Sequence, residues 1–162
     1  MRARDSILDI CAGYDLGRFL QSIESAPLRY SQVVICSPYI DEQLQTWMTR
    51  FAVVAGNFGC AVRIITKVSE LPAILKFWPE RNYFGPRSLI MVSQLHAKVY
   101  LALGRDRRDS QVMVTSANLT EAGLSKNIEL GLLVHASSFE GARIVEEVRR
   151  FLESLVSTTK ER

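Results

Sequence analysis

The sequence lacks the features that define disulfide-rich, zinc-binding and membrane-spanning proteins. It has three cysteines, an odd number, and none with C-x-x-C spacing, so we expect no disulfide framework and no zinc site. No apolar run approaches the ~20 residues that span a bilayer, and the N-terminal MRARDSILDICAGYD lacks the apolar core of a signal peptide. From these observations we expect a cytoplasmic, reducing environment and no membrane partner. The sequence also has no internal repeat, low-complexity tract or linker, which favours one domain.

The composition is typical of a globular protein with a buried core. The 162 residues are 48% hydrophobic and 23% charged, which predicts a single domain over residues 1–162. The formal net charge of +3 permits an anionic partner, such as a nucleic acid or a phosphate ester, without requiring one.

Apolar periodicity predicts alternating strands and helices in the first half of the chain. Continuous apolar runs indicate buried strands at 33–36 and 61–66. Helical spacing indicates a helix at 16–26 capped by Asp15, another at 42–56 capped by Asp41, and a third from Ser69 to residue 78. Residues 1–14 are ambiguous, with a strand or an extended arm around 6–10. This order is the signature of an α/β layer fold.

The second half reads as a run of strands closed by a helix. Strands are predicted at 89–92, 96–103, 111–115 and 127–134, with a charged hairpin turn at 104–110 and an amphipathic helix at 139–156. The loop at 79–87 carries two arginines among aromatic residues, a mixture that suits a nucleic acid strand but also an ordinary packed surface loop. The arginines of the hairpin turn either contact phosphates or are simply solvated.

Five polar residues gather at the predicted strand ends: His96, Lys98, Ser116, Asn118 and Glu129. Residues i and i+2 of a strand share a face, and polar groups pinned to buried strands are costly unless they are paired or used. Taken singly, each has a structural explanation: a satisfied core histidine, a lysine at a strand edge, two turn caps and a surface carboxylate. Together they favour a functional cluster. His135 has no such companions and is interpreted as a strand-end residue.

The pattern His96-x-Lys98, Ser116-x-Asn118 and Glu129 eleven residues on resembles the signature of the phospholipase D superfamily. That signature is H-x-K, four residues and Asp, then G-S-x-N and a downstream Glu. The resemblance covers about residues 89–135 and implies an α/β fold with a mixed central β-sheet flanked by helices on both faces. Leu103 replaces the Asp and Thr115 replaces the Gly. A branch of the superfamily with metal-independent restriction-type endonucleases also lacks the Asp, which is usually regarded as structural support.

The resemblance further implies a mechanism and an assembly. Superfamily enzymes bring two motif copies to one site, and this chain carries one, so we expect a homodimer. His96 would attack phosphorus to form a phosphohistidine while the other subunit's His96 protonates the leaving group. Lys98, Asn118 and Ser116 would bind the phosphate, and Glu129 would orient an imidazole. No metal or other cofactor is then required.

The leading hypothesis is a metal-independent nuclease acting on nucleic acid, on DNA in preference to RNA. Its proposed substrate-binding residues are Arg81, Arg87 and Arg105. Two alternatives stay open. One is a hydrolase of phospholipids or other small phosphodiesters, for which the same catalytic residues would serve. The other is a non-catalytic DNA-binding or dimerisation module of a larger restriction or helicase-type system, suggested by the missing Asp.

Overall fold

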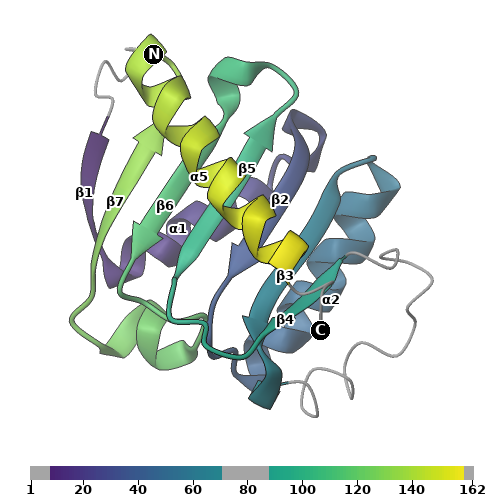
Figure 1. Cartoon of the computed structure of the whole chain (residues 1–162), viewed down its shortest axis with the longest axis vertical. Helices are drawn as coiled ribbons and strands as arrows, with labels where there is room; N and C mark the ends of the chain where they lie inside the picture. The colour runs from purple at the N-terminus through teal and green to yellow at the C-terminus, as the bar shows by residue number, and fades with distance from the viewer. Residues whose placement is uncertain (1–7, 71–87, 159–162) are drawn as a thin grey trace.

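A seven-stranded mixed sheet forms the centre of the molecule (Figure 1). The computed structural model describes residues 8–70 and 88–158. The strand order is β1-β7-β6-β5-β2-β3-β4; β2, β3 and β4 are parallel neighbours, and all other neighbours are antiparallel. The strands are β1 (Leu8–Ala12), β2 (Tyr30–Cys36), β3 (Ala61–Lys67), β4 (Leu89–Val92), β5 (Val99–Gly104), β6 (Gln111–Thr115) and β7 (Leu130–His135).

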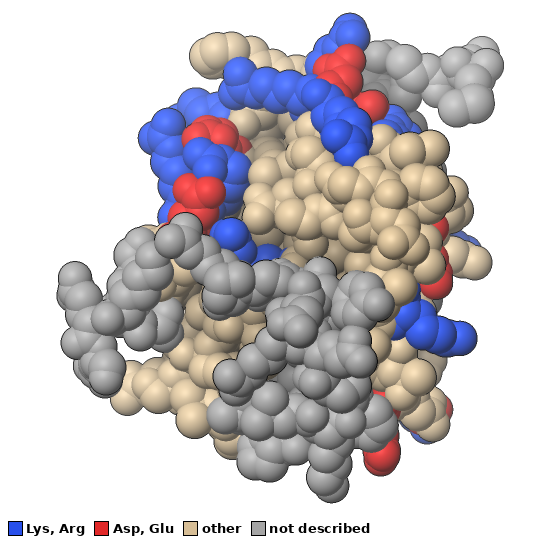
Figure 2. All heavy atoms as spheres, turned by 90° about the vertical axis from the view of Figure 1, so that its right-hand side faces the viewer, with Lys and Arg blue, Asp and Glu red and all other residues tan. Residues whose placement is uncertain are grey.

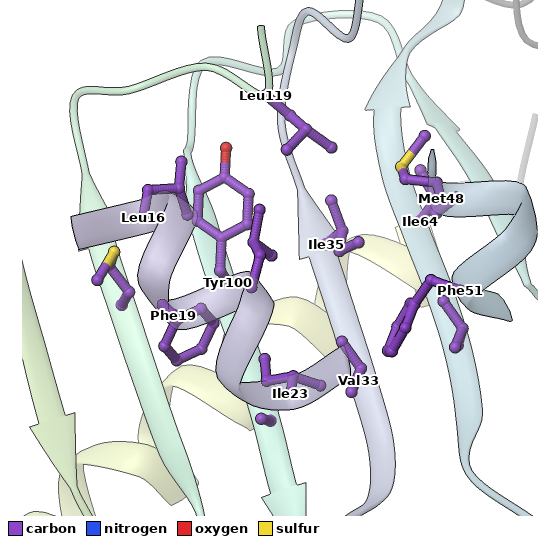
Figure 3. Packing of buried hydrophobic residues seen from close by; sticks show 14 of the residues in the cluster. Leu16, Phe19, Ile23, Val33, Ile35, Met48, Phe51, Ile64, Tyr100 and Leu119 are labelled. Atoms are coloured by element: carbon purple, nitrogen blue, oxygen red, sulfur yellow. The ribbon is translucent and has the colours of Figure 1, made fainter. Parts of the chain in front are cut away.

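Helices cover both faces of this sheet, as the sequence predicted. Helices α1 (Gly13–Glu24) and α2 (Glu42–Asn57) pack on one face, and α5 (Phe139–Thr158) crosses the other (Figure 1). Figure 3 shows the first core layer, in which Leu16, Phe19 and Ile23 of α1 lie against the sheet. The second layer is formed by sheet residues with Val145 and Leu152 of α5. Within the described residues, no helix combines the length and apolar character needed to cross a membrane.

The N-termini of the first two helices differ in how they are capped. Asp41 is the N-cap of α2, as predicted, and its Oδ1 accepts from the Leu44 N–H at 3.0 Å. The predicted cap at Asp15 is wrong, because α1 begins at Gly13 and Ala12 occupies the N-cap position. Asp15 lies in the first turn, where its carboxylate accepts from the Ala12 N–H at 2.8 Å and favourably faces the positive end of the helix.

The strands that carry the motif are shorter than the sequence indicated. The predicted strand 96–103 begins only at Val99, and the predicted strand 127–134 begins only at Leu130. One hydrogen bond between the two segments continues just outside the strand: the Lys98 carbonyl accepts from the Thr115 N–H at 3.1 Å. Of the helix predicted from Ser69 to residue 78, only the first residues are described, and they belong to a short 3₁₀ turn, Val68–Glu70. Residues 71–78 and the loop predicted at 79–87 lie outside the described residues.

Candidate active site

The motif residues meet at one end of the sheet, just beyond three neighbouring strands. Strands β5, β6 and β7 are consecutive antiparallel neighbours. The start of β5, the end of β6 and the start of β7 therefore lie at the same end of the sheet, the lower end in Figure 1. This end of the strands is called the motif edge below. The residues that this edge brings together are His96, Lys98, Ser116, Asn118 and Glu129.

Ser116 and Glu129 form a side-chain hydrogen bond at this edge. The Ser116 hydroxyl donates to Glu129 Oε2 and also accepts from the Leu130 N–H at 3.1 Å. The other carboxylate oxygen, Oε1, accepts from the Asn127 side-chain amide at 3.1 Å. Asn127 was missed at the sequence level, because an exposed polar residue before a strand carries no periodic signal. Within a single chain, then, Glu129 is held by a hydroxyl and an amide, and no imidazole from the described residues bonds to it.

His96 is exposed and lies beside Lys98. The Lys98 ammonium donates to the His96 carbonyl at 3.3 Å, and no carboxylate of the described residues forms an ion pair with it. Both residues line an open depression of about 540 Å³ whose other wall includes Val148 and Phe151 of α5. The imidazole is thus accessible to a substrate at the rim of a largely apolar hollow.

Asn118 is held by its backbone and leaves part of its amide unused. Its Oδ1 is buried and lacks a hydrogen-bond partner among residues 8–70 and 88–158. The turn of residues Ala122–Lys126 closes around its carbonyl, because a Cβ added at Gly123 would lie 2.4 Å from that oxygen. This close approach fixes the backbone of Asn118 in the loop that follows β6.

A buried polar network supports this loop from below. The Tyr100 hydroxyl donates to the Ala117 carbonyl at 3.1 Å, and the fully buried Ser37 hydroxyl accepts from the Leu119 N–H at 3.0 Å. Figure 3 shows the Tyr100 ring packed in the core with its oxygen directed toward the end where Leu119 lies. Burial raises the pKa of Tyr100 and outweighs the opposing hydrogen bond with Ser37, so this phenol stays a neutral donor.

The structure shows what surrounds the two residues that depart from the family signature, Thr115 and Leu103. Thr115, at the position of the family's Gly, lies opposite Gly131 of β7. A Cβ at Gly131 would come within 3.0 Å of the Thr115 Cβ, so the missing side chain on one strand makes room for the extra one on the other. Leu103, at the position of the family's Asp, packs near the end of β5 against the core layer under α5.

One of the three predicted substrate-binding arginines, Arg105, lies away from this edge. Arg105 follows the far end of β5, and its guanidinium donates to the carbonyls of Leu28, Phe58 and Gly59 at 3.1, 2.8 and 3.1 Å. It therefore ties surface loops together at the end of the sheet opposite His96. Arg81 and Arg87 lie outside the described residues.

His135 also lies away from the motif. It ends β7, opposite Gln111 at the start of β6, and its Nε2 is 3.5 Å from Asp9 Oδ2. No group of three or more His, Cys, Asp or Glu suited to a metal occurs in the described ranges. Figure 2 shows basic and acidic side chains next to one another on the face that it presents. Ion pairs of the described residues include those of Arg149 and Arg150 with Glu146.

Three solved structures share this fold at low sequence identity. NucT from Helicobacter pylori is 13% identical, with a TM-score of 0.65 over 93% of this chain and 95% of NucT. The phospholipase D family member Nuc from Salmonella typhimurium is 19% identical, with a TM-score of 0.53 over 91% of each chain. The archaeal chromatin protein TrmBL2, whose structure shows a mode of DNA binding, is 11% identical, with a TM-score of 0.57 over 99% of this chain, which spans 55% of TrmBL2.

Comparison with curated protein sequences gives no match. A family model does match: residues 19–156 fit the model described as "Cardiolipin synthase, PLD-like domain". The matched range covers most of the chain and contains every motif position from His96 to Glu129. The chain therefore belongs to this PLD-like domain family and, through it, to the phospholipase D superfamily.

Proposed function

We propose that the protein is a phosphodiesterase that cleaves nucleic acid, DNA in preference to RNA, at a site completed by two subunits and without a metal ion. The observation that carries the shared site is the placement of the histidines. The chain has only two; His96 is exposed at the motif edge, whereas His135 ends β7 at the far edge beside Asp9. A reaction that needs two imidazoles at one phosphorus must take the second from another chain.

The proposed reaction has two balanced steps. In the first, an imidazole nitrogen of His96 attacks phosphorus, the bond from phosphorus to the leaving oxygen breaks, and the other subunit's His96 gives that oxygen a proton. In the second, the same imidazole of the other subunit takes a proton from water. The resulting nucleophile displaces His96 from phosphorus and releases a phosphomonoester.

The remaining motif residues supply charge and position. Lys98, which has no carboxylate partner among the described residues, provides a cation for the phosphoryl oxygens. Asn118 offers an amide donor from a loop that is fixed on both sides. Glu129 is held by Ser116 and Asn127, yet a carboxylate oxygen can accept more than one hydrogen bond. It can therefore still accept from an imidazole N–H when the complete site forms.

Exposed apolar side chains beside the depression favour a second copy as its cover. Val114 of β6, Leu132 of β7 and Ile10 of β1 form one row across three strands. They are 41%, 42% and 77% exposed. They lie on the face that α5 only partly covers, because Leu132 is two residues from Val134 of the α5 core layer and so shares its face. An apolar stretch of this kind next to His96 is the kind of surface that a subunit interface buries.

The same apolar depression also favours a second candidate, hydrolysis of a phospholipid. An acyl chain lying against Val148 and Phe151 would bring its phosphodiester to His96. If a second subunit covers this hollow, an acyl chain cannot enter it. If the protein is monomeric, the hollow is open to an acyl chain. Oligomeric state and substrate class are therefore linked.

Cleavage assays in EDTA test the proposal. Wild type, His96→Ala and His135→Gln are compared on single- and double-stranded DNA, RNA and phospholipid vesicles. We expect EDTA-resistant DNA cleavage that His96→Ala abolishes and His135→Gln, remote from the motif edge, leaves unchanged. Nucleic-acid binding without cutting would support the non-catalytic module instead, and cleavage of lipid alone would support the phospholipase.

Subunit mixing tests the shared site separately. Wild type and His96→Ala protein are unfolded together and refolded at varied ratios, and specific activity is measured. A site that needs both imidazoles predicts activity that falls as the square of the wild-type fraction. A linear fall, or a monomer by light scattering that is fully active, would contradict the shared site while leaving the single-chain chemistry standing.

A further inference from the structure

Tyr39 and Lys67 form a pair at the edge where the motif residues lie, although they belong to neither the motif nor the loops around it. Tyr39 follows β2, and Lys67 is the last residue of β3. The ammonium of Lys67 donates to the Tyr39 hydroxyl at 3.1 Å and lies 4.7 Å from the ring centroid. An aromatic ring with an adjacent cation is a common element of single-strand nucleic acid binding.

The strand register places this pair at the same end of the sheet as His96. Cys36, the last residue of β2, is opposite Val99, the first residue of β5. Tyr39 is three residues after Cys36, and His96 is three residues before Val99, so both extend beyond the same end of the antiparallel pair. Lys67 joins them because β3 runs parallel to β2, with Ile65 opposite Cys36.

Hydrogen bonds through the Ser37 hydroxyl connect Tyr39 to the loop of Asn118. The buried Ser37 hydroxyl donates to the Tyr39 carbonyl at 2.8 Å and accepts from the N–H of Leu119, the residue after Asn118, at 3.0 Å. A parallel bridge between Ile40 and Leu119 joins the same two segments. The backbone of Tyr39 is therefore fixed relative to a residue proposed to bind phosphate.

The ring and the cation are both available to a ligand. Tyr39 is 47% exposed. The Lys67 ammonium lies closer to the phenol oxygen than to the ring centre, so it does not occupy the middle of the ring. No carboxylate among residues 8–70 and 88–158 forms an ion pair with Lys67, which leaves its charge uncompensated in this part of the chain.

We infer that Tyr39 stacks on an unpaired nucleobase next to the scissile phosphodiester and that Lys67 contacts an adjacent phosphate. The inference rests on the proposed function and narrows it, since it names single-stranded nucleic acid as the substrate. A base inside a duplex is already stacked on both sides and cannot cover the ring. A phospholipid offers no base at all.

The test compares normal single-stranded DNA with an oligonucleotide of the same length made of abasic units. The readout is the ratio of kcat/KM on the two substrates. Wild type should prefer the base-bearing strand, and Tyr39→Ala should reduce that preference by about 5- to 140-fold, the range that base–aromatic stacking carries. Tyr39→Phe keeps the ring and should keep the preference. Phe58→Ala is the matched control, because Phe58 is 43% exposed but follows α2 at the opposite end of the sheet.

The phosphate contact of Lys67 is tested separately, through the salt dependence of DNA binding. Binding of single-stranded DNA to Lys67→Met should show a salt dependence that is less steep by about 0.7 in the slope of log K against log salt, as for the loss of one phosphate contact. The base preference should survive this substitution, because the ring remains. An unchanged slope would overturn the phosphate contact.

The outcomes separate this inference from the proposed function. Wild type that cleaves DNA while Tyr39→Ala retains the full base preference overturns the stacking role alone. Wild type that hydrolyses only small phosphodiesters also overturns it and leaves the phosphodiesterase in place. Wild type that neither cleaves nor binds nucleic acid overturns both. A Tyr39→Ala protein that changes from dimer to monomer in light scattering would assign the ring to a subunit contact and so refute base stacking.

Discussion

Substituting Ser37 by alanine should destabilise the protein far more than the loss of one small hydroxyl suggests. Ser37 is fully buried, and its hydroxyl serves both the Leu119 N–H and the Tyr39 carbonyl. Without it, the buried N–H of Leu119 loses its partner, at a cost of about 1–3 kcal/mol, and the Tyr39 carbonyl loses a hydrogen bond worth about 0.5–1.5 kcal/mol. We expect a total of roughly 2–4 kcal/mol, a large share of the ~5–15 kcal/mol that a domain of this kind possesses.

Urea unfolding measures this loss directly. With a slope of about 1–3 kcal/mol per molar urea, the midpoint should fall by about 0.7 to 4 M. Ser31→Ala is the matched control, because the Ser31 hydroxyl also donates to a carbonyl, that of Leu103 at 3.2 Å, but does so at the exposed surface. It should change stability by less than about 0.5 kcal/mol. In Ser37→Ala, hydrogen exchange of the Leu119 amide should accelerate as well.

Two results would refute this reasoning. One is a Ser37→Ala protein whose stability lies within the range of the Ser31 control. The other is a loss of stability with no change in exchange at Leu119, which would place the cost elsewhere. Activity gives a further check, since a loosened Asn118 loop should lower kcat on any phosphodiester that the wild type cleaves.

Three further predictions concern the contact between strands β6 and β7, the stability of the protein at acid pH and the reactivity of a buried thiol. Gly131→Ala should cost about 1–2 kcal/mol in urea unfolding, because its Cβ meets Thr115, and the cost should shrink in a Thr115→Gly background; equal costs in both backgrounds would contradict the contact. Hydrogen bonding from Arg149 lowers the pKa of Glu146 to about 2. Its contribution to stability is therefore present above the ordinary carboxyl pKa and lost as the pH falls toward 2. The difference in Tm between wild type and Glu146→Gln should accordingly narrow from pH 7 to pH 2, and a constant gap would refute the assignment. Burial raises the pKa of the Cys36 thiol to about 12, so this thiol should react with Ellman's reagent only after unfolding, and rapid labelling of the native protein would contradict its burial.

The strands and the layer order could be predicted because each signal is local. The apolar run at 33–36 and the helical spacing of 139–156 each indicate one burial pattern, and both were confirmed. Asp41 was recognised because an acidic residue before an amphipathic stretch has one good use, as an N-cap. Asp15 has the same composition signal, but the helix starts one turn earlier, which only the preceding backbone decides.

The details of the candidate site depend on partners that lie far away in the sequence. The strand that follows His96 begins late because its neighbour β6 ends at Thr115, and nothing within residues 96–98 records that limit. Glu129 accepts a hydrogen bond from Ser116, which lies 13 residues earlier and follows the neighbouring strand. The pairing of Tyr39 with Lys67 spans 28 residues and two strands. The motif residues could be named from the sequence, whereas their contacts and their roles in catalysis could not.

The order of the strands also has a consequence for how the protein folds. The three strands that bear the motif follow one another along the chain, and Lys98 pairs with a residue only 17 positions away, Thr115. By contrast, Cys36 must find Val99 across more than sixty residues. Short loops close at lower entropic cost than long ones. We therefore expect the β5–β6–β7 meander to assemble first and to serve as the template on which the N-terminal half of the sheet is completed.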